Sequence, residues 1–368
     1  MMNTFPRILE LCELNGFLKP VIVNGIVSYF KYGPLGELLA QNIRNEWIYS
    51  NVINRDENVY LHYDAKSGIE PSKYSKEAFK TARTLNNGHL PFGLATIREG
   101  QKQPLVINNE SSIKYFHPSM SNCLKYTAFT STNQGQQFFY RWQHQRKIWW
   151  RKFSADPGRF SLSEIHSESS DLETTHIIAN FPWGNETLET ITNYGTSLYE
   201  NLSTSEKTFF EARDGNKKTL PYVVESVCSE GTSALTFLSD AYNEPTVMGS
   251  SKKVLRLHRK LAPYKICFAA APTSNAVKDE IRLLATFLNK GLRKAGISTL
   301  LPSTVLAKKA LESQHALNDS LGIPFTIVLS QTTLENGILG IRSRETTLEE
   351  QSHVSKLVSY IELLMKNY

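Results

Sequence analysis

The sequence predicts an α/β (α+β) protein in two parts. The larger part, residues 1–250, has an antiparallel or mixed sheet, and the compact part, residues 251–368, has a mixed sheet. A chain of 368 residues is too long for one ordinary hydrophobic core. Strand-like stretches outnumber helical ones between residues 89 and 244, whereas strands and helices alternate after residue 252. The boundary is therefore expected near residues 250–263.

The opening of the chain contains one clear amphipathic helix. The run YGPLG at residues 32–36 reads as a turn, and apolar side chains then recur at helical spacing up to Trp47. The helix is therefore expected to begin just after Pro34. Residues 61–88, by contrast, are polar and rich in Lys and Ser, with only a weak helical pattern. We expect them to form an exposed loop or short hairpin outside the core.

The middle of the chain combines strands with one long helix. The stretches LPFGLATI, PLVIN and YVVESV are strand-like, and residues 138–153 form a helix with an aromatic face that includes Trp149 and Trp150. These tryptophans are predicted to lie in the core, with the flanking basic residues exposed. Residues 161–175 are acidic and rich in Ser, so we expect a mobile loop there.

The last part is a regular succession of strands and helices. Strands are predicted at KICFAAAP, GISTLLP, PFTIVLS and ILGIRSR, and helices at residues 275–295, 304–321 and 349–367. The resulting order, βαβαββα, is typical of a compact α/β domain whose mixed sheet is mostly parallel.

Composition excludes several classes of protein. No apolar run reaches the length that a membrane-spanning helix needs. The four cysteines, Cys12, Cys123, Cys228 and Cys267, are scattered, without a CxxC pair or a histidine at ligand spacing. We therefore expect free, buried thiols in a reducing compartment, with no disulfide framework and no zinc site.

Positive charge is concentrated in two regions. The net charge is +6, but residues 246–310 hold 13 Lys or Arg against Asp279 and Glu280 alone. Residues 141–160 add six basic residues against Asp156. Such clusters attract polyanions and steer their approach. A solvated basic surface that only maintains solubility is equally compatible with the charge distribution.

Catalytic motifs are missing from the sequence. It contains no P-loop, GxGxxG, GxSxG or HExxH motif, and its nine histidines are dispersed. We therefore expect no cofactor and no metal. The first residues, MMNTFPRILELCELNGF, hold one arginine and two glutamates, which is not the composition of an organellar transit peptide.

Four blocks of residues, in order along nearly the whole chain, carry a family resemblance. They are Gly25, Phe30, residues 32–36, Asn42, Ile43 and Trp47; residues 94–97; residues 221–225 and 240–242; and residues 262–263, 296–297, 322–325 and 342–346. The first three blocks are similar to the three signatures of glycyl-type class II aminoacyl-tRNA synthetases, and the fourth to their anticodon-binding domain. The resemblance implies a synthetase-like sheet domain followed by an anticodon-binding-like domain.

The nucleotide-binding positions of that family are altered in this chain. Where the resemblance implies an arginine for the α-phosphate of ATP and a glutamate after it, the chain has Lys102 and Pro104. Where it implies a glycine and a second arginine, the chain has Ser229 and Thr232. Lysine lacks the bidentate fork of arginine. A charge-assisted contact to phosphate contributes about 1.5–3 kcal/mol, so the loss of two predicts a catalytically inactive site.

Further motifs carry a second resemblance. They are IWWRKF at residues 148–153, FPWG at 181–184, RDG at 213–215, KVLRLH at 253–258 and TTLENG at 332–337. They resemble the accessory (processivity) subunits of the mitochondrial DNA polymerase. The resemblance implies a non-catalytic protein of the mitochondrial matrix and nucleoid. It would bind the catalytic subunit largely through the C-terminal domain and raise its DNA affinity and processivity.

Some members of that family also bind duplex DNA, and some carry a long helical insertion that builds a homodimer. In this chain the short polar segment at residues 61–88 stands in its place. The resemblance therefore implies one copy per catalytic subunit and no homodimer.

Two sets of residues are predicted to make these contacts. The exposed faces of residues 252–260 and 342–345 are expected to contact the catalytic subunit, and the basic end of the helix at residues 138–153 is expected to contact DNA phosphates. The residues are Lys252, Lys253, Arg256, Arg259, Arg342, Arg344 and Glu345 for the protein partner, and Arg146, Lys147, Arg151 and Lys152 for DNA. Two alternatives stay open: a non-catalytic tRNA- or RNA-binding protein, and an active glycyl-type synthetase.

Overall fold

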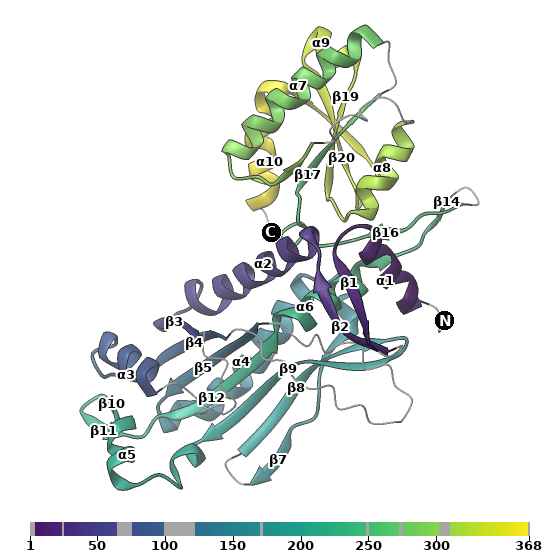
Figure 1. Ribbon diagram of the computed structural model, residues 1–368. Coiled ribbons are helices and arrows are strands. Elements are labelled where there is room, and N and C mark those ends of the chain that lie inside the picture. The colour runs from purple at the N-terminus through teal and green to yellow at the C-terminus, as the bar shows by residue number, and fades with distance from the viewer. Residues whose placement is uncertain are drawn as a thin grey trace.

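The chain forms a large twisted sheet with its helices and, at one end of it, a smaller α/β unit made of the C-terminal residues (Figure 1). The computed structural model describes residues 4–23, 26–64, 76–98, 122–169, 172–247, 250–271, 275–301 and 310–366. Within these ranges both sheets are mixed, which confirms the predicted fold class. The predicted strand PLVIN lies outside the described residues.

The N-terminal elements form a layer beside the large sheet. Helix α1 (Thr4–Leu14) leads into an antiparallel hairpin of β1 (Leu18–Val23) and β2 (Ile26–Tyr32). Helix α2 (Pro34–Ile48) begins at Pro34, where the prediction had it begin just after this residue, and a π-helical turn (Tyr49–Ile53) extends it. The YGPLG turn needs its glycines, because a Cβ on Gly36 would clash with the Phe17 carbonyl.

The large sheet has eight strands in the order β3-β4-β5-β12-β9-β8-β6, with β7 paired to β8. Only β3 and β4 are parallel to each other, and all other neighbours are antiparallel. The strands are β3 (Val59–Asp64), β4 (Phe92–Arg98), β5 (Cys123–Thr130), β6 (Phe160–Leu162), β7 (His166–Ser169), β8 (Leu172–Phe181), β9 (Gly184–Gly195) and β12 (Tyr222–Ser229).

Two helices cover one face of this sheet. Helix α4 (Thr132–Lys152) begins six residues before its predicted start at residue 138, and α6 (Glu230–Ala241) follows β12 directly. Trp149 and Trp150 are buried in the main core, as predicted. Their rings pack against Phe153 and Phe237, and Trp142 stacks on Tyr126 at a centroid distance of 4.3 Å. A short 3-10 turn, Pro157–Arg159, links α4 to β6.

Residues 61–88 were expected to lie outside the core, and that prediction is wrong. They begin in β3, and after residues that the structure does not describe they form α3 (Lys76–Leu85). Phe79 is fully buried in a second core on the other face of the sheet. Its neighbours there come from β4, β5 and α5 (Thr204–Phe210). Three apolar side chains on one helical face outweighed the polar composition of the segment.

Residues 161–175 were expected to form a mobile loop, and this prediction is also wrong. Apart from residues 163–165, the described part of this segment lies in β6, β7 and β8, where β7 and β8 pair antiparallel. Thr175 alternates with polar neighbours along β8 and points into the core. Alternation of Thr, His and Ile is a strand signal that the Ser and Glu content of the segment obscured.

Several short elements lie outside the two main sheets. After a 3-10 turn (Ser197–Tyr199), β10 (Ala212–Asp214) and β11 (Lys217–Thr219) form a small hairpin. Beyond α6, β13 (Tyr242–Asn243) pairs with β16 (Val254–Leu255), and β14 (Thr246–Val247) pairs with β15 (Ser250–Ser251).

The C-terminal sheet has five strands in the order β18-β17-β19-β20-β21. The first three are parallel, and β20 and β21 are antiparallel additions. The strands are β17 (Ile266–Ala270), β18 (Thr299–Leu300), β19 (Phe325–Leu329), β20 (Ile338–Ser343) and β21 (Glu349–His353). All four predicted strands are present, but β21 occupies the start of the predicted closing helix.

Helices cover both faces of this sheet. Helix α7 (Asn275–Lys294), α9 (Gln331–Asn336) and α10 (Leu357–Lys366) contribute to a core on one face, and α8 (Leu311–Ser320) lies on the other (Figure 1). Helix α9 was not predicted from the sequence, and a 3-10 turn (Val354–Lys356) precedes α10. Most of the residues predicted as the helix 304–321 before Leu311 lie outside the described ranges.

The two parts have separate hydrophobic cores. The described residues of the main core end at Ala262, and those of the C-terminal core begin at Ile266. All four cysteines are free thiols, and three of them are buried, as predicted. Burial raises the pKa of the Cys12 and Cys267 thiols to about 12, so these two are unreactive. In the part of the chain that the structure describes, no helix is both long and apolar enough to cross a membrane.

Replacing Phe79 by alanine is expected to lower the free energy of unfolding by about 3–5 kcal/mol, because it leaves a cavity among Phe92, Phe129 and Phe210. Leu85→Ala is the control, since Leu85 ends the same helix with 61% of its surface exposed and is expected to change stability by about 0.5 kcal/mol or less. Denaturant unfolding measures both. Equal values for the two variants would contradict a core role for α3.

Candidate interaction cleft

Residues 256–265, which we call the joining segment, connect the two parts of the chain. Arg344 of the C-terminal unit holds this segment in place. Arg344 donates from Nη2 to the Leu257 carbonyl at 2.6 Å and from Nη1 to the Gly322 carbonyl at 2.7 Å. Next to it on β20, Arg342 forms a bidentate ion pair with Asp319 of α8, at 2.9 and 3.0 Å. Arg344 and Arg342 are only 6% and 9% exposed.

The prediction of an exposed partner-binding surface at these two arginines is therefore wrong. Both guanidinium groups donate to acceptors within the protein. A buried charge needs such partners for its donors. Burial is also the main reason why the pKa of Arg344 lies below its usual range. No local pattern indicated this, because Asp319 lies 23 residues from Arg342 and Leu257 lies 87 residues from Arg344.

The other side of the joining segment is held by the large domain and by α10. Asn42 of α2 donates to the carbonyls of Leu261 and Ala262 at 3.0 and 3.1 Å. Arg259 donates to the Leu364 carbonyl at 2.6 Å. Lys265 donates to the carbonyls of Lys260 and Ala262, and burial lowers its pKa to about 7. The segment is thus fixed on both sides.

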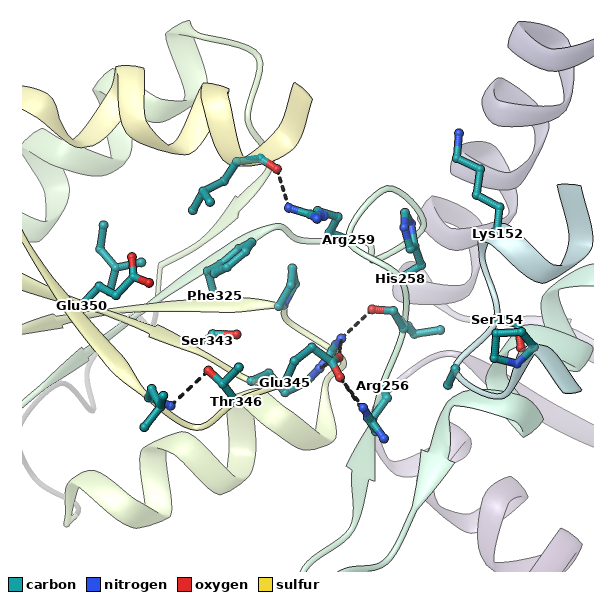
Figure 2. A pocket seen from close by; sticks show the side chains of 18 of the residues that line it. Lys152, Ser154, Arg256, His258, Arg259, Phe325, Ser343, Glu345, Thr346 and Glu350 are labelled. Carbon is teal, nitrogen blue, oxygen red and sulfur yellow. Dashed lines mark hydrogen bonds and ion pairs between the residues drawn. The ribbon is translucent and has the colours of Figure 1, made fainter. Parts of the chain in front are cut away.

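A cleft of about 580 Å³ lies along this segment, between the end of α4 and the C-terminal sheet (Figure 2). We call it the basic cleft. Cationic side chains line it, with two carboxylates and an apolar floor. The lining residues that matter here are Arg151, Lys152, Arg256, His258, Arg259 and Arg344, with Glu345 and Glu350, over Leu257, Phe325, Ile341, Tyr360 and Leu364. The structure therefore brings members of both predicted contact sets into one site.

Acidic side chains partly neutralise the cations at the edge of the cleft. Arg256 forms an ion pair with Glu345 at 2.7 Å, and both side chains are more than 40% exposed. Although burial alone would raise the pKa of Glu345, the neighbouring Arg344 and Arg256 lower it. Lys253 pairs with Glu10 of α1 at 2.9 Å. These exposed pairs contribute about 0–1 kcal/mol each, so a partner with its own carboxylates can replace them.

His258 lines the cleft among its basic residues. Its ring packs edge-on against Phe153 at 5.1 Å, and its Nδ1 accepts the backbone N–H of Lys260 at 3.2 Å. Burial, followed by the charges of Arg259 and Lys152, lowers the pKa of His258 to about 4. The imidazole is therefore neutral at physiological pH, and the positive charge of the cleft comes from lysine and arginine alone.

Arg146 was predicted to contact DNA, and the structure contradicts this because the side chain is only 1% exposed. Its Nε donates to Glu189 at 2.7 Å, and its guanidinium lies 4.6 Å from the centre of the Trp149 ring. Trp150 and Ser226 donate to the same carboxylate. Arg146 is therefore part of the core, in a network around one buried charge.

The other three predicted DNA contacts lie toward the surface of α4. Arg151 and Lys152 are exposed and Lys147 is half-buried. Arg151 donates twice to the Phe160 carbonyl, at 3.0 and 2.8 Å, and lines the cleft. No acidic residue occurs anywhere in α4. Arg151 and Lys152 thus have their predicted exposure, and the contact of all three residues with DNA stays a prediction.

The altered nucleotide-binding positions are only partly described. Lys102 and Pro104 lie outside the described residues. Ser229 is the N-cap of α6, with its hydroxyl accepting the Thr232 backbone N–H at 3.3 Å, and Thr232 is buried. Beside them Glu230 forms a bidentate pair with Arg44 of α2, at 2.9 and 3.0 Å, and accepts from Asn122. Arg44, the cation beside these altered positions, is thus bound to Glu230, a carboxylate of the protein itself.

The Arg44–Glu230 pair and the apolar floor of the cleft were not predicted, because the residues that form them are far apart in the sequence. The pattern of residues within one segment does not indicate such contacts. For metals, no group of three His, Cys, Asp or Glu side chains within the described ranges is arranged to hold an ion.

Residues 269–364 match the family described as anticodon binding domain. Over 352 aligned residues the chain is 23% identical to glycine–tRNA ligase of Treponema denticola, with 90% of this chain and 73% of the ligase covered. Together with the mixed sheets, these matches define the class as a synthetase-like scaffold that carries an anticodon-binding domain.

Within that class the chain is similar to proteins named DNA polymerase subunit gamma-2. It is 32% identical to the mitochondrial protein of Xenopus laevis over 284 residues, which cover 75% of this chain and 60% of the frog protein. It is 28% identical to the protein of Mus musculus over 384 aligned residues, covering 90% of this chain and 82% of the mouse protein. The predicted resemblance to polymerase accessory subunits is thereby confirmed.

Arg146→Leu is expected to lower the free energy of unfolding by about 3–5 kcal/mol, because it leaves the buried carboxylate of Glu189 without its counter-charge. Lys147→Leu, the adjacent residue, is the matched control and is expected to change stability by about 0.5 kcal/mol or less. Denaturant unfolding of both variants tests the assignment. A stable Arg146→Leu protein would show that Arg146 is not part of the core network.

Proposed function

We propose that this protein is a non-catalytic accessory subunit of the mitochondrial DNA polymerase. In this role it binds the catalytic subunit in the mitochondrial matrix, at the nucleoid, and raises that subunit's affinity for DNA and its processivity. The observation that carries the proposal is the basic cleft, in which cations from α4 and from the joining segment meet over an apolar floor. The similarity to the frog and mouse subunits supplies the partner.

The chemistry of the cleft favours a protein partner at its centre. A purely phosphate-binding groove needs cations without carboxylates, whereas this cleft also holds Glu345, Glu350 and the apolar side chains of Phe325 and Leu364. Mixed charge over an apolar floor is typical of a protein interface. The acid-free outer side of α4, with Lys147, Arg151 and Lys152, extends from it as a track for duplex phosphates.

The absence of catalysis is part of the proposal. Thr232 is a short neutral side chain at a position where the synthetases need a cation for ATP, and the neighbouring Arg44 is bound to Glu230. We also propose a two-domain division, with residues 1–250 as the inactive synthetase-like domain. The two separate cores support two domains, although the main core continues to Ala262 and the second begins at Ile266. We further propose one accessory copy per catalytic subunit.

Reversing three charges on the stretch that leads into the cleft, with Lys252→Glu, Lys253→Glu and Arg256→Glu together, is expected to reduce stimulation of the catalytic subunit about tenfold. Of the three residues, Arg256 lines the cleft itself. The melting temperature should not change, because the pairs of Lys253 and Arg256 are exposed and contribute little to stability. Processivity on primed single-stranded DNA is the measurement.

The control for this experiment is Lys217→Glu with Lys218→Glu. Both lysines are exposed, and they lie in β11 of the large domain, away from the cleft (Figure 1). This variant should stimulate like the unmodified protein. If the triple variant stimulates normally as well, the surface of Lys252, Lys253 and Arg256 is not part of the contact.

ATP–pyrophosphate exchange with glycine is expected to be undetectable with this protein, because the groups that grip the triphosphate are altered. A glycyl-tRNA synthetase of known activity is the positive control. Robust exchange would establish the alternative of an active synthetase.

A non-catalytic tRNA- or RNA-binding role is the second candidate, and the match to the anticodon binding domain family favours it. The two roles differ in ligand preference. Filter binding with tRNA against primer–template DNA, in the presence of the catalytic subunit, separates them, since an accessory subunit should prefer the primer–template complex.

A further inference from the structure

Lys265, the last residue of the joining segment, binds back to that segment through its side-chain amine. Its Nζ donates to the Lys260 carbonyl at 2.8 Å and to the Ala262 carbonyl at 2.7 Å. The backbone of Lys265 is fixed as well, because its N–H donates to the Ser298 carbonyl at 2.9 Å and its carbonyl accepts the N–H of Phe325 at 3.3 Å. The amine is therefore held at a defined place in the fold.

The Lys265 side chain also lines a cavity of about 360 Å³ between α2, the joining segment, the residues after α7, and α10 (Figure 1). We call it the α2–α10 cavity. The lining residues that matter here are Asn45 and Glu46 of α2, Lys260 and Lys265 of the joining segment, and Glu362 and Lys366 of α10. Part of the Lys265 surface is exposed, so a small molecule in the cavity can reach it.

The protonation state of the Lys265 amine decides its chemistry. Burial lowers its pKa to about 7, and of the neighbouring charges Glu46 raises this pKa and Lys260 lowers it. Helix α10 adds one charge of each sign, Glu362 and Lys366, and residues 295–297 add none. About half of the Lys265 amines are therefore neutral at pH 7, whereas an ordinary lysine is almost entirely protonated there.

The neutral amine of Lys265 keeps its lone pair available. A neutral amine has two N–H groups and one lone pair, and the two carbonyls of the joining segment accept both N–H groups. Among the residues that the structure describes, no third acceptor is bonded to this nitrogen. A desolvated lysine with a lowered pKa and a free lone pair has the properties of an activated nucleophile.

We propose that Lys265 is a site of acylation by acyl thioesters of small carboxylic acids. The lone pair of Nζ attacks the carbonyl carbon of the thioester. The C–N bond forms as the C–S bond breaks, and the thiolate leaves with the electron pair of the C–S bond. The nitrogen releases one proton, which the thiolate takes up, so that nothing is oxidised or reduced. Acylation of Lys265 does not depend on the function proposed above.

The hydrogen bonds of the joining segment favour an acyl donor over an aldehyde or ketone. An acylated nitrogen keeps one N–H, which continues to donate to one of the two carbonyls. A neutral imine has no N–H and leaves both carbonyls without their donor, at a cost in free energy. The new acyl oxygen also finds donors among the lining residues of the cavity, in Asn45, Lys260 and Lys366.

Incubation of the full-length protein with acetyl-coenzyme A, followed by peptide mapping with mass spectrometry, tests the proposal. At pH 7 we expect Lys265 to be acetylated at least about tenfold faster than Lys217 and Lys218, two exposed lysines of β11. The neutral fraction of an amine with a pKa of about 7 is about a thousandfold that of an ordinary lysine. Partial burial and the lower basicity of the amine offset part of this advantage.

The pH dependence gives a second readout. Because the pKa of Lys265 is lowered and only the neutral amine reacts, its acetylation rate should rise up to about pH 7–8 and then level off. The rates of Lys217 and Lys218 should keep rising through pH 9. Equal rates of the three lysines at pH 7, or a rate of Lys265 that rises in parallel with the other two up to pH 9, would overturn the proposal.

The variant Glu46→Gln tests whether the reaction takes place in the α2–α10 cavity. It removes the carboxylate that raises the pKa of Lys265 and releases Lys260 from its pair with Glu46 at 3.8 Å. The pH at which the acetylation rate of Lys265 reaches half of its plateau should therefore fall by about half a unit or more.

Glu37→Gln is the matched control, since Glu37 is an exposed carboxylate of the same helix and does not line the cavity. This variant should leave the midpoint of the Lys265 profile unchanged. A midpoint that Glu46→Gln does not move, or that both variants move equally, shows that the charges of the cavity do not control the amine, and the proposal is then wrong.

Discussion

The position of the joining segment depends on one buried cation. Arg344 binds the carbonyls of Leu257 and Gly322, and thereby ties the segment to the loop after α8. The Arg342–Asp319 pair next to it holds the same region of the sheet and helix together. Because Leu257 forms part of the floor of the basic cleft, the shape of the cleft follows from this attachment. Arg342 and Arg344, which were predicted from the sequence to lie on a binding surface, instead help to hold the two parts of the chain in place.

Burial sorts the basic residues of this chain into two groups. Arg146, Arg342 and Arg344 are enclosed and use their donors on internal acceptors, so they define the structure. Lys152, Arg256 and Lys253 are at least partly exposed and have acidic partners at most at the surface. Exchange of one surface partner for another costs little, whereas exchange inside the core costs a desolvated charge. Only the second group can respond to a binding partner.

The sequence predicted what depends on local patterns. The start of α2 near Pro34, four of the five strands of the C-terminal sheet and the buried tryptophans of α4 all follow from turn residues and periodicity. It misjudged α3 and the strands β6 to β8, where polar composition concealed a narrow apolar pattern. It could not indicate which arginines are buried, because Glu189 and Asp319 reach Arg146 and Arg342 only through the tertiary fold. For the same reason the sequence could not indicate the apolar floor of the cleft.

The network around Glu189 has a consequence for how this protein can change over generations. One carboxylate there serves Arg146, Trp150 and Ser226 at once, within a single buried site. Loss of either charge alone leaves the other unpaired, while loss of both together is tolerated more easily. A lineage can therefore leave this arrangement only by two nearly simultaneous substitutions. The pair is expected to be inherited as a unit, even where the surface around it drifts freely.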